Sequence, residues 1–375
     1  MPRLASPPPL LRLLPLLLPL AAALSTRDSH PPARPAVPRS LLLLRGGAAS
    51  QPIASVKSPK EAYEGFAKKG AANAKLPLLN VLHQSVMGGC YVGLGGLLSM
   101  TIAGSVPGIA SSNPGLQKFI FAALFPVNLL LILMTGGQLF TGNSAAVPAA
   151  MYEGLVTFPE LVRSWVVSYV GNIIGCGALA LAATYCGLNS YGTAELAVAT
   201  AAKKCASSFG PTLVKAILCN WLVCLAVFLA GASDDLAGKM VGIWFPISTF
   251  VAIGLEHSVA NLFLLPMGLL AGAKLSLADV IFKNLIPVTI GNAIAGAFVV
   301  AAGYSYAFGA LGKVADDAVP IAVSSAREAP PDEGHLPSPV ITPPSGHEVG
   351  VETQQDPMSA HVDTAPEGSP DAPTV

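Results

Sequence analysis

Charged residues are scarce in this chain of 375 residues, in which 11% of the positions are Asp, Glu, Lys or Arg and 52% are hydrophobic. Soluble domains carry about one quarter charged residues, so this composition excludes an ordinary water-soluble enzyme. The 21 basic and 21 acidic residues cancel, which argues against a nucleic-acid partner, because such a partner needs a basic surface. Residues 57–312 hold only thirteen basic and nine acidic residues. These are too few to cover a water-facing surface, and we predict an integral membrane domain.

The sequence also lacks the patterns of most cofactor and catalytic sites. Its six cysteines form no closely spaced metal-type pair, and Cys219 and Cys224, the nearest two, are interpreted as small apolar residues. No Gly-rich phosphate loop follows a strand, so ATP-driven transport finds no support. An enzyme would need a metal cluster or a nucleophile beside an oriented base. A water channel of the aquaporin type would show two Asn-Pro-Ala triplets, which are absent. We therefore expect no cofactor, no metal, no catalytic residue and no enzymatic activity.

Residues 1–52 are predicted to be a targeting leader. Arg3 and Arg12 precede the apolar run Leu13–Leu24, which is short for a membrane span and typical of a secretory signal. Residues 26–50 are rich in Arg, Ser and Pro, as in a transit peptide. In series, the two segments indicate the plastid (chloroplast) envelope. The alternatives are one long transit peptide, or a signal peptide with a spacer, and a location in the plasma membrane.

The segments that flank the predicted spans differ from each other. Residues 311–375 are rich in Pro and acids and are predicted to form a disordered tail, because they cannot bury enough apolar surface to offset chain entropy. Residues 53–77 are predicted to form an amphipathic helix in the membrane interface. Ser58 and Glu61 have the spacing of a capping box at its start. Its apolar face consists of Ala62, Tyr63, Phe66, Ala67, Gly70 and Ala74.

Residues 78–310 are predicted to form a six-span transport domain. Four apolar stretches, at about residues 83–104, 161–186, 212–231 and 284–306, are each near the roughly 20 residues that cross the hydrocarbon layer. Two longer regions, 119–151 and 241–272, are interrupted by polar and Gly-rich sequence at 136–144 and 254–261. A helix over 241–253 would rise only about 20 Å. Each region is therefore interpreted as two half-helices that meet inside the bilayer, beside a cavity.

An internal repeat supports this arrangement. Residues 169–175, Tyr-Val-Gly-Asn-Ile-Ile-Gly, resemble residues 289–295, Thr-Ile-Gly-Asn-Ala-Ile-Ala, at an offset of 120. With three spans in each half, the two copies enter the membrane from opposite sides. The predicted fold class is thus an all-α integral membrane protein with six transmembrane helices in an inverted 3+3 repeat and two broken helices. Transporters and channels use this architecture, with the substrate path at the repeat interface.

Two ionisable residues, Glu256 and His257, fall at the break of the fifth span. Ionisable groups inside a membrane are costly, so they indicate a functional site. The alternative is that both merely satisfy loose backbone ends at the break. An imidazole titrates near physiological pH, so His257 could supply a proton or a hydrogen bond to a passing anion.

Short polar residues beside the breaks are predicted to cap the half-helices. Ser258 and Asn261 would cap the helix after the second break, and Thr141 or Ser144 would do so after the first. Two helix N-termini that converge on one spot favour a small anion without a fixed positive charge. A simple cap is the alternative role for Thr141.

Three motifs carry a resemblance to a known family. They are Leu139-Phe140-Thr141-Gly142-Asn143, the run 254–261 (Gly-Leu-Glu-His-Ser-Val-Ala-Asn) with Leu265-Pro266-Met267-Gly268, and the run 284–292 (Asn-Leu-Ile-Pro-Val-Thr-Ile-Gly-Asn). They closely resemble the formate/nitrite transporter family, and the likeness extends from Ser58 to about Tyr306. With the plastid-like leader, the chain is most similar to the chloroplast nitrite transporters of algae.

The resemblance implies an aquaporin-like protomer, a homopentamer, and one substrate path through each protomer. It also implies two apolar constrictions around a central histidine. The path residues implied by the resemblance or proposed from the pattern are His257, Thr141, Asn261, Asn292, Asn220, Asn172, Glu256 and the vestibule residue Lys204; the constriction residues are Phe125 and Phe250 on one side, Leu129 and Phe140 on the other. The alternatives are a solvated loop charge for Lys204, plain helix packing for Phe125 and its partners, and interhelical hydrogen bonding for Asn172 and Asn292.

The implied function is passage of a small monovalent anion, through a channel or linked to protons. A lysine concentrates the anion, a dry ring excludes hydrated ions, and His257 offers a proton. Nitrite is preferred because plastids reduce nitrite; formate, lactate and hydrosulfide are the alternatives. The expected partners are thus the anion, membrane lipid and further copies of the chain, with H⁺ as a further partner if passage is linked to protons. One departure matters: the family usually has an acid before Leu-Phe-Thr, and this chain has Gln138, which weakens the case for pH gating by a carboxylate there.

Overall fold

The structure, a computed structural model, describes residues 56–314. The predicted leader and the tail beyond Val314 lie outside the described residues. Within them the secondary structure is helical, apart from one isolated antiparallel bridge between Val56 and Ser233. Residues 311–314 are helical, so the predicted start of the disordered tail at 311 is wrong. The short segment around that point, with Gly309 and Gly312, shows no apolar periodicity, and the sequence therefore did not indicate a helix there.

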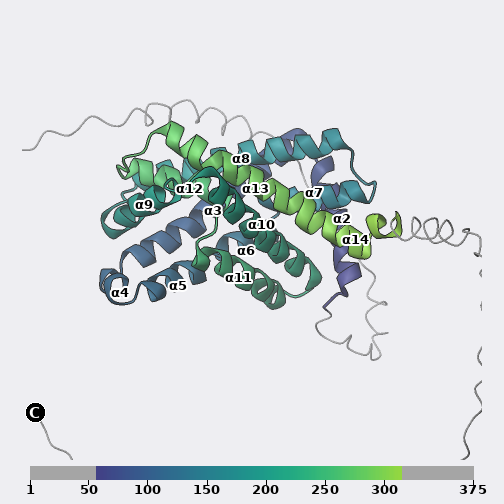
Figure 1. Cartoon of the computed structure of the whole chain (residues 1–375), viewed down its shortest axis with the longest axis horizontal. Helices are drawn as coiled ribbons and strands as arrows, with labels where there is room; N and C mark the ends of the chain where they lie inside the picture. Colours follow the sequence, from purple (N-terminus) through teal and green to yellow (C-terminus); the bar gives the residue numbers. More distant parts are fainter. Residues whose placement is uncertain (1–55, 315–375) are drawn as a thin grey trace, which may run out of the picture. The chain divides into compact units, whose positions relative to one another are not determined.

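Helix α2 (Pro59–Lys75) is the predicted amphipathic helix. The Ser58 side chain accepts a hydrogen bond from the backbone N–H of Glu61, and the Glu61 carboxylate accepts one from the backbone N–H of Ser58 at 2.9 Å. This capping box is the one predicted. The predicted apolar face is buried, and it packs on α7 and α10. The face of α2 thus fixes its position on the bundle, where it lies beside α14 (Figure 1).

Among the described residues, the first half of the domain contains seven helices before α9. They are α2, α3 (Leu78–Gly104), α4 (Pro107–Ser112), α5 (Pro114–Leu124), α6 (Val127–Thr135), α7 (Phe140–Tyr152) and α8 (Phe158–Tyr185), where α2 is the interfacial helix and the other six follow it.

The second half repeats this order. Its elements are α9 (Tyr191–Lys204), α10 (Phe209–Ala232), α11 (Leu236–Ile253), α12 (Ser258–Leu270), and a last long helix made of η3 (Asp279–Leu285), α13 (Ile286–Ile294), η4 (Ala295–Ala302) and α14 (Gly303–Phe308). The η segments are π-helical turns within this last helix.

Six helical segments of the described residues are long and apolar enough to cross a membrane. They are α3, α5 with α6, α8, α10, α11 and the last helix, Asp279–Phe308. This confirms the predicted number of spans. The first pieces of the two interrupted regions are longer than predicted, however. Helix α11 begins at Leu236 and has 18 residues. The Asp235 side chain accepts a hydrogen bond from Gly238 N and caps the first turn. The apolar pattern does not include this turn, so the predicted helix began later.

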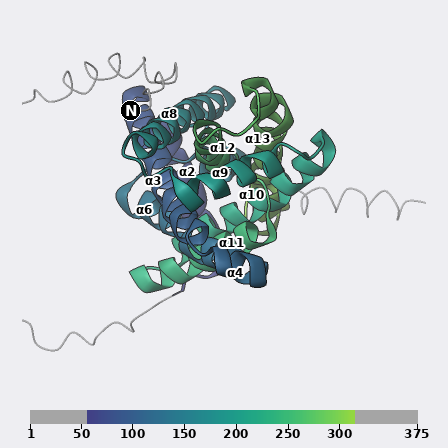
Figure 2. The same cartoon turned by 90° about the vertical axis from the view of Figure 1, so that its left-hand side faces the viewer.

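The packing of the two halves is equivalent. Helix α2 packs on α7 as α9 packs on α12, and α3 packs on α8 as α10 packs on α13. Figure 2 shows α9 lying against α12. Glycine makes these contacts close: a Cβ on Gly175 of α8 would lie 2.0 Å from the carbonyl oxygen of Val86 on α3. Helices α7 and α12, with 13 residues each, are held inside this framework rather than spanning the membrane alone.

Candidate functional site

Two backbone breaks define the centre of the domain. Helix α6 ends at Thr135 and α11 at Ile253, and the C-cap residues that follow, Gly136 (φ 81°) and Gly254 (φ 80°), have the left-handed conformation that disfavours other residues. The chain is non-helical at 136–139 and 254–257, and helices resume at Phe140 and Ser258. The breaks are shorter than predicted, because polar residues such as Thr141 are packed within protein and remain helical.

Asn172 of α8 braces the first break. Its side-chain Oδ1 accepts a hydrogen bond from Phe140 N at 2.9 Å. Its Nδ2 donates to the carbonyl oxygens of Gln138 at 3.0 Å and Ser85 at 2.8 Å. One amide thus caps α7 and fixes the residue before it.

Asn292 of α13 does the same at the second break. Its Oδ1 accepts from Ser258 N at 2.8 Å, and its Nδ2 donates to the carbonyl oxygens of Glu256 at 3.1 Å and Ala216 at 2.8 Å. The two motif asparagines therefore hold equivalent backbone atoms in the two halves. Helix α13 meets α8 where Tyr169 OH and Thr289 Oγ1 lie 2.8 Å apart.

The predicted caps of α7 and α12 are wrong. His257 is the N-cap of α12, and its Nδ1 accepts a hydrogen bond from Ala260 N at 2.9 Å. Asn261 donates to Glu256 instead, and the N-cap of α7 is Leu139, without a side-chain cap. The reason is positional: a cap side chain belongs to the residue just before the helix, and each helix starts earlier than the sequence indicated.

Glu256 lies at the centre of a buried polar network. Its Oε2 is 3.0 Å from Lys204 Nζ, and the two side chains are 8% and 15% exposed. The same oxygen accepts from Asn261 Nδ2 at 2.7 Å and Asn284 Nδ2 at 3.2 Å. A buried ion pair is costly unless further hydrogen bonds satisfy it, and these amides supply them. Lys204 is therefore part of this buried network, and its charge is paired rather than solvated.

A cavity of about 300 Å³ reaches this network from one side of the domain. His257 and Glu256 line it, together with the rings of Phe125 and Phe250. The Phe250 ring is stacked on the His257 ring with centroids 5.6 Å apart, and Phe125 meets Phe250 edge-on at 6.3 Å. Of the two residues of the predicted first constriction, Phe250 thus contacts the imidazole and Phe125 contacts Phe250. Four lysines line the same cavity: Lys118, Lys203, Lys204 and Lys215.

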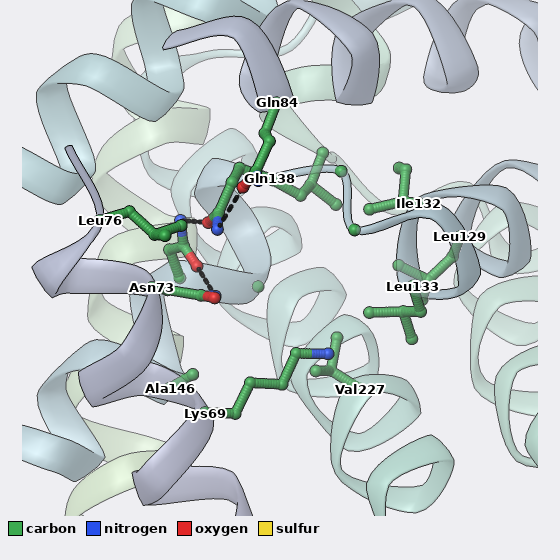
Figure 3. A pocket seen from close by; sticks show the side chains of 15 residues that line it. Lys69, Asn73, Leu76, Gln84, Leu129, Ile132, Leu133, Gln138, Ala146 and Val227 are labelled. Carbon is green, nitrogen blue, oxygen red and sulfur yellow. Dashed lines mark hydrogen bonds between the residues drawn. The ribbon is translucent and has the colours of Figure 1, made fainter. Parts of the chain in front are cut away.

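A second cavity, of about 230 Å³, lies beside the first break (Figure 3). Leu129 and Leu139 line it. Phe140, predicted to form the second constriction with Leu129, lines neither cavity in the described part of the chain. It is buried with its ring 5.1 Å from that of Tyr169 and 6.0 Å from that of Trp165.

Several buried polar atoms at the centre have no hydrogen-bond partner among the described residues. They are Thr141 Oγ1, Asn220 Oδ1, Ser258 Oγ and Asn261 Oδ1. Asn220 Nδ2 meanwhile donates to Ser144 Oγ at 2.8 Å and to the carbonyl oxygen of Asn292 at 2.7 Å. An unpartnered buried polar atom costs about 1–3 kcal/mol, so this group of atoms indicates a place where water or a polar solute is bound.

Sequence reasoning missed the polar residues of the second cavity and the role of Asn284. The signal was present as a second internal repeat, called here the second internal register, in which equivalent residues are 118 positions apart. In it, Gly136, Gln138 and Asn143 correspond to Gly254, Glu256 and Asn261. Because the residue types differ at the middle position, a search for identical letters does not find it.

An all-α domain with six membrane spans, two breaks braced alike and a cavity beside each break has the architecture of a membrane transport protein. The family model described as formate/nitrite transporter matches residues 60–306. The chain belongs to this family, whose members are transporters and channels for small anions and not enzymes.

Relatives and solved structures agree with this assignment. A probable formate transporter of Methanothermobacter thermautotrophicus is 38% identical over 275 residues, which cover 68% of this chain and 98% of that protein. A formate channel of Bacillus thuringiensis is 36% identical over 253 residues, 66% of this chain and 93% of that one. The solved structure of an ion channel of this family superposes with a TM-score of 0.60 at 28% identity and covers 66% of this chain and 98% of its own.

Proposed function

We propose that the protein carries a small monovalent anion of the size of nitrite or formate through the path between the two cavities. The observation that carries this proposal is His257, which lies at a helix break, against the Phe250 ring and next to a buried Lys204–Glu256 pair. The four lysines of the larger cavity attract an anion, and the rings of Phe125 and Phe250 strip its hydration.

The hydrogen bonds of His257 define what its ring offers to the anion. Because Nδ1 accepts from Ala260 N, the proton of the neutral ring is on Nε2. His257 therefore acts in this state as a hydrogen-bond donor to the anion. Transfer of a proton to the anion requires Nδ1 to be protonated, which breaks the cap on α12. Proton coupling, where it occurs, is thus linked to opening of the turn at Ala260.

Flux measurements test this function. Proteoliposomes with the purified chain are expected to take up nitrite and formate, and His257→Ala should reduce the rate at least tenfold, since the anion loses its donor in a dry site, worth about 1.5–3 kcal/mol. Thr141→Ala should reduce it less. His83→Ala is the matched control, because His83 is exposed on α3. Wild-type rates in His257→Ala would refute the site.

Nitrite is the first candidate substrate, because the predicted leader indicates plastids, which reduce nitrite. Formate is the second, since two relatives that match two thirds of this chain are named for formate. The pore residues do not distinguish the two. Competition of nitrite with labelled formate in the same vesicles, with lactate and hydrosulfide as further competitors, ranks them directly.

We also infer a pentamer in a plastid envelope. A solved pentameric formate channel superposes with a TM-score of 0.53 at 25% identity and covers 66% of this chain. Many large apolar side chains of the spans are exposed in the single chain, among them Phe245, Phe282 and Phe298, as expected of surfaces that face lipid or another protomer. Light scattering in detergent should give five copies, and residues 1–56 fused to a fluorescent protein should reach plastids.

A further inference from the structure

The second internal register pairs the two cavities residue by residue. Gln138 occupies in the first half the position of Glu256 in the second, and Asn143 that of Asn261. The hydrogen bonds are equivalent too: Asn143 Nδ2 donates to Gln138 Oε1 at 2.8 Å as Asn261 Nδ2 donates to Glu256 Oε2 at 2.7 Å. The halves differ in charge at this point, because Gln138 is neutral where Glu256 is a carboxylate.

A chain of amides lines one wall of the smaller cavity. Asn73 Nδ2 donates to Asn143 Oδ1 at 3.0 Å, Asn143 donates to Gln138, and Gln138 Nε2 donates to Gln84 Oε1 at 3.2 Å. All three bonds run in the same direction, so the NH₂ group of Gln84 is left as a donor at the end. Figure 3 shows this chain on one side of the cavity, with Leu129, Ile132 and Leu133 across from it.

Lys69 of α2 is the single charged residue among the described residues that line this cavity. Its side chain extends from α2 below the amide chain toward Val227 (Figure 3), which lines the same cavity. The described residues provide it with no ion pair, whereas Lys204 in the other cavity is paired with Glu256. The surrounding protein lowers the pKa of Lys69 by desolvation, and Lys239 lowers it further. A bound anion would offset both effects.

We propose that this cavity is a second anion site, in which Lys69 and the amide donors hold a small monovalent anion before it passes Leu129 and Leu139. Gln138 is the residue that keeps the site open: a carboxylate at that position would compete with the anion for Lys69, as Glu256 does for Lys204. The inference rests on the proposed function and adds a separate entrance site with its own affinity.

Transport from one defined side tests the site. In proteoliposomes of uniform orientation, Lys69→Met should raise the apparent KM for nitrite entering from the Lys69 side about two- to fivefold, the worth of a partly exposed charge contact, with the maximal rate unchanged. Lys69→Arg should keep the wild-type KM. Gln138→Glu should raise KM as Lys69→Met does, and the double variant should be no worse than Lys69→Met, because both changes remove one interaction.

Lys68→Met is the matched control, since Lys68 is exposed on the same helix and lines neither cavity. It should behave as wild type, and KM for entry from the His257 side should be the same in all variants. A wild-type KM in Lys69→Met, or an equal rise in Lys68→Met, overturns the second site alone. A wild-type chain that carries neither nitrite nor formate overturns the proposed function as well.

Discussion

Asn172 and Asn292 show how much one side chain can define in a membrane domain. Each accepts from the first N–H of a short helix and donates to the carbonyl two residues earlier. Backbone groups inside the bilayer have no water to replace a lost partner. Each asparagine is therefore a positioning residue for the break that it braces. Asn292 fixes the backbone on both sides of His257, whose ring is stacked on Phe250.

Asn292→Asp is expected to destabilise the domain by about 2 kcal/mol or more. The substitution keeps the acceptor for Ser258 N but turns two donated bonds into contacts between oxygens, and each buried group left unpaired costs about 1–3 kcal/mol. Thermal unfolding in detergent measures the loss. Asn80→Asp, at an exposed position of α3, should be neutral. Equal melting temperatures for wild type and Asn292→Asp would contradict the bracing role.

Single residues differ in how visible they are in the sequence. Glu256 and His257 stand out because ionisable residues are rare within apolar spans. Lys69 does not, since α2 carries several lysines and its pattern only shows which face is buried. The cavity that Lys69 enters is built by α3, α6 and α7, and no local pattern indicates that these segments meet there.

At the scale of elements, the spacing of small residues determines how closely helices approach. Gly175 and Gly177 lie two residues apart on α8. A Cβ on Gly175 would lie 2.0 Å from Val86 O, whereas a Cβ on Gly177 would meet nothing within 4 Å. The first glycine is required by packing against α3 and the second is not.

Gly175→Ala should therefore lower the free energy of unfolding by about 1–3 kcal/mol, the usual cost of overpacking. Gly177→Ala should be neutral or stabilise by up to about 1 kcal/mol through helix propensity. Melting temperatures of the two variants in the same detergent provide the comparison. A larger loss for Gly177→Ala would show that the helices α3 and α8 do not pack as described.

The number and order of the membrane spans could be predicted from apolar run length, and the positions of the breaks from Gly136 and Gly254. The lengths of the two breaks could not be predicted. A polar residue such as Asn143 is unfavourable in a helix that faces lipid, but inside protein its side chain hydrogen-bonds to Gln138 and Asn73. The predicted breaks therefore ran too far along α7 and α12, and the predicted caps were displaced with them.

At the scale of the whole domain, Glu153 joins three distant segments. Its carboxylate accepts from Tyr63 OH at 2.7 Å, Ser305 Oγ at 2.8 Å and Ala310 N at 3.1 Å. Burial alone would raise the pKa of Glu153, but these hydrogen bonds outweigh it and lower the pKa below its ordinary value of 4.5. The carboxylate thus ties α2 and the end of the last helix to the loop after α7.

The lowered pKa predicts a loss of stability in acid. A group with a depressed pKa in the folded state stabilises it above the unfolded pKa and loses this contribution as the pH falls through the folded value. The free energy of unfolding of the wild type should therefore fall by about 1–2 kcal/mol more than that of Glu153→Gln between roughly pH 5 and pH 3. Melting curves of both proteins, recorded at a series of pH values, measure this difference. Glu64→Gln, exposed on α2, should follow wild type; parallel curves for Glu153→Gln would contradict this role.

The bridge between Val56 and Ser233 has a consequence for maturation. Lys57 N donates to Ala232 O at 2.9 Å, and Lys57 Nζ lies 2.7 Å from Asp234 Oδ1. The backbone segment just before α2 is thereby bound to the turn between α10 and α11. If the predicted leader is removed, a cut upstream of Val56 keeps these contacts, whereas a cut after Lys57 removes them and leaves α2 held by the contacts of its own residues, chiefly its buried apolar face.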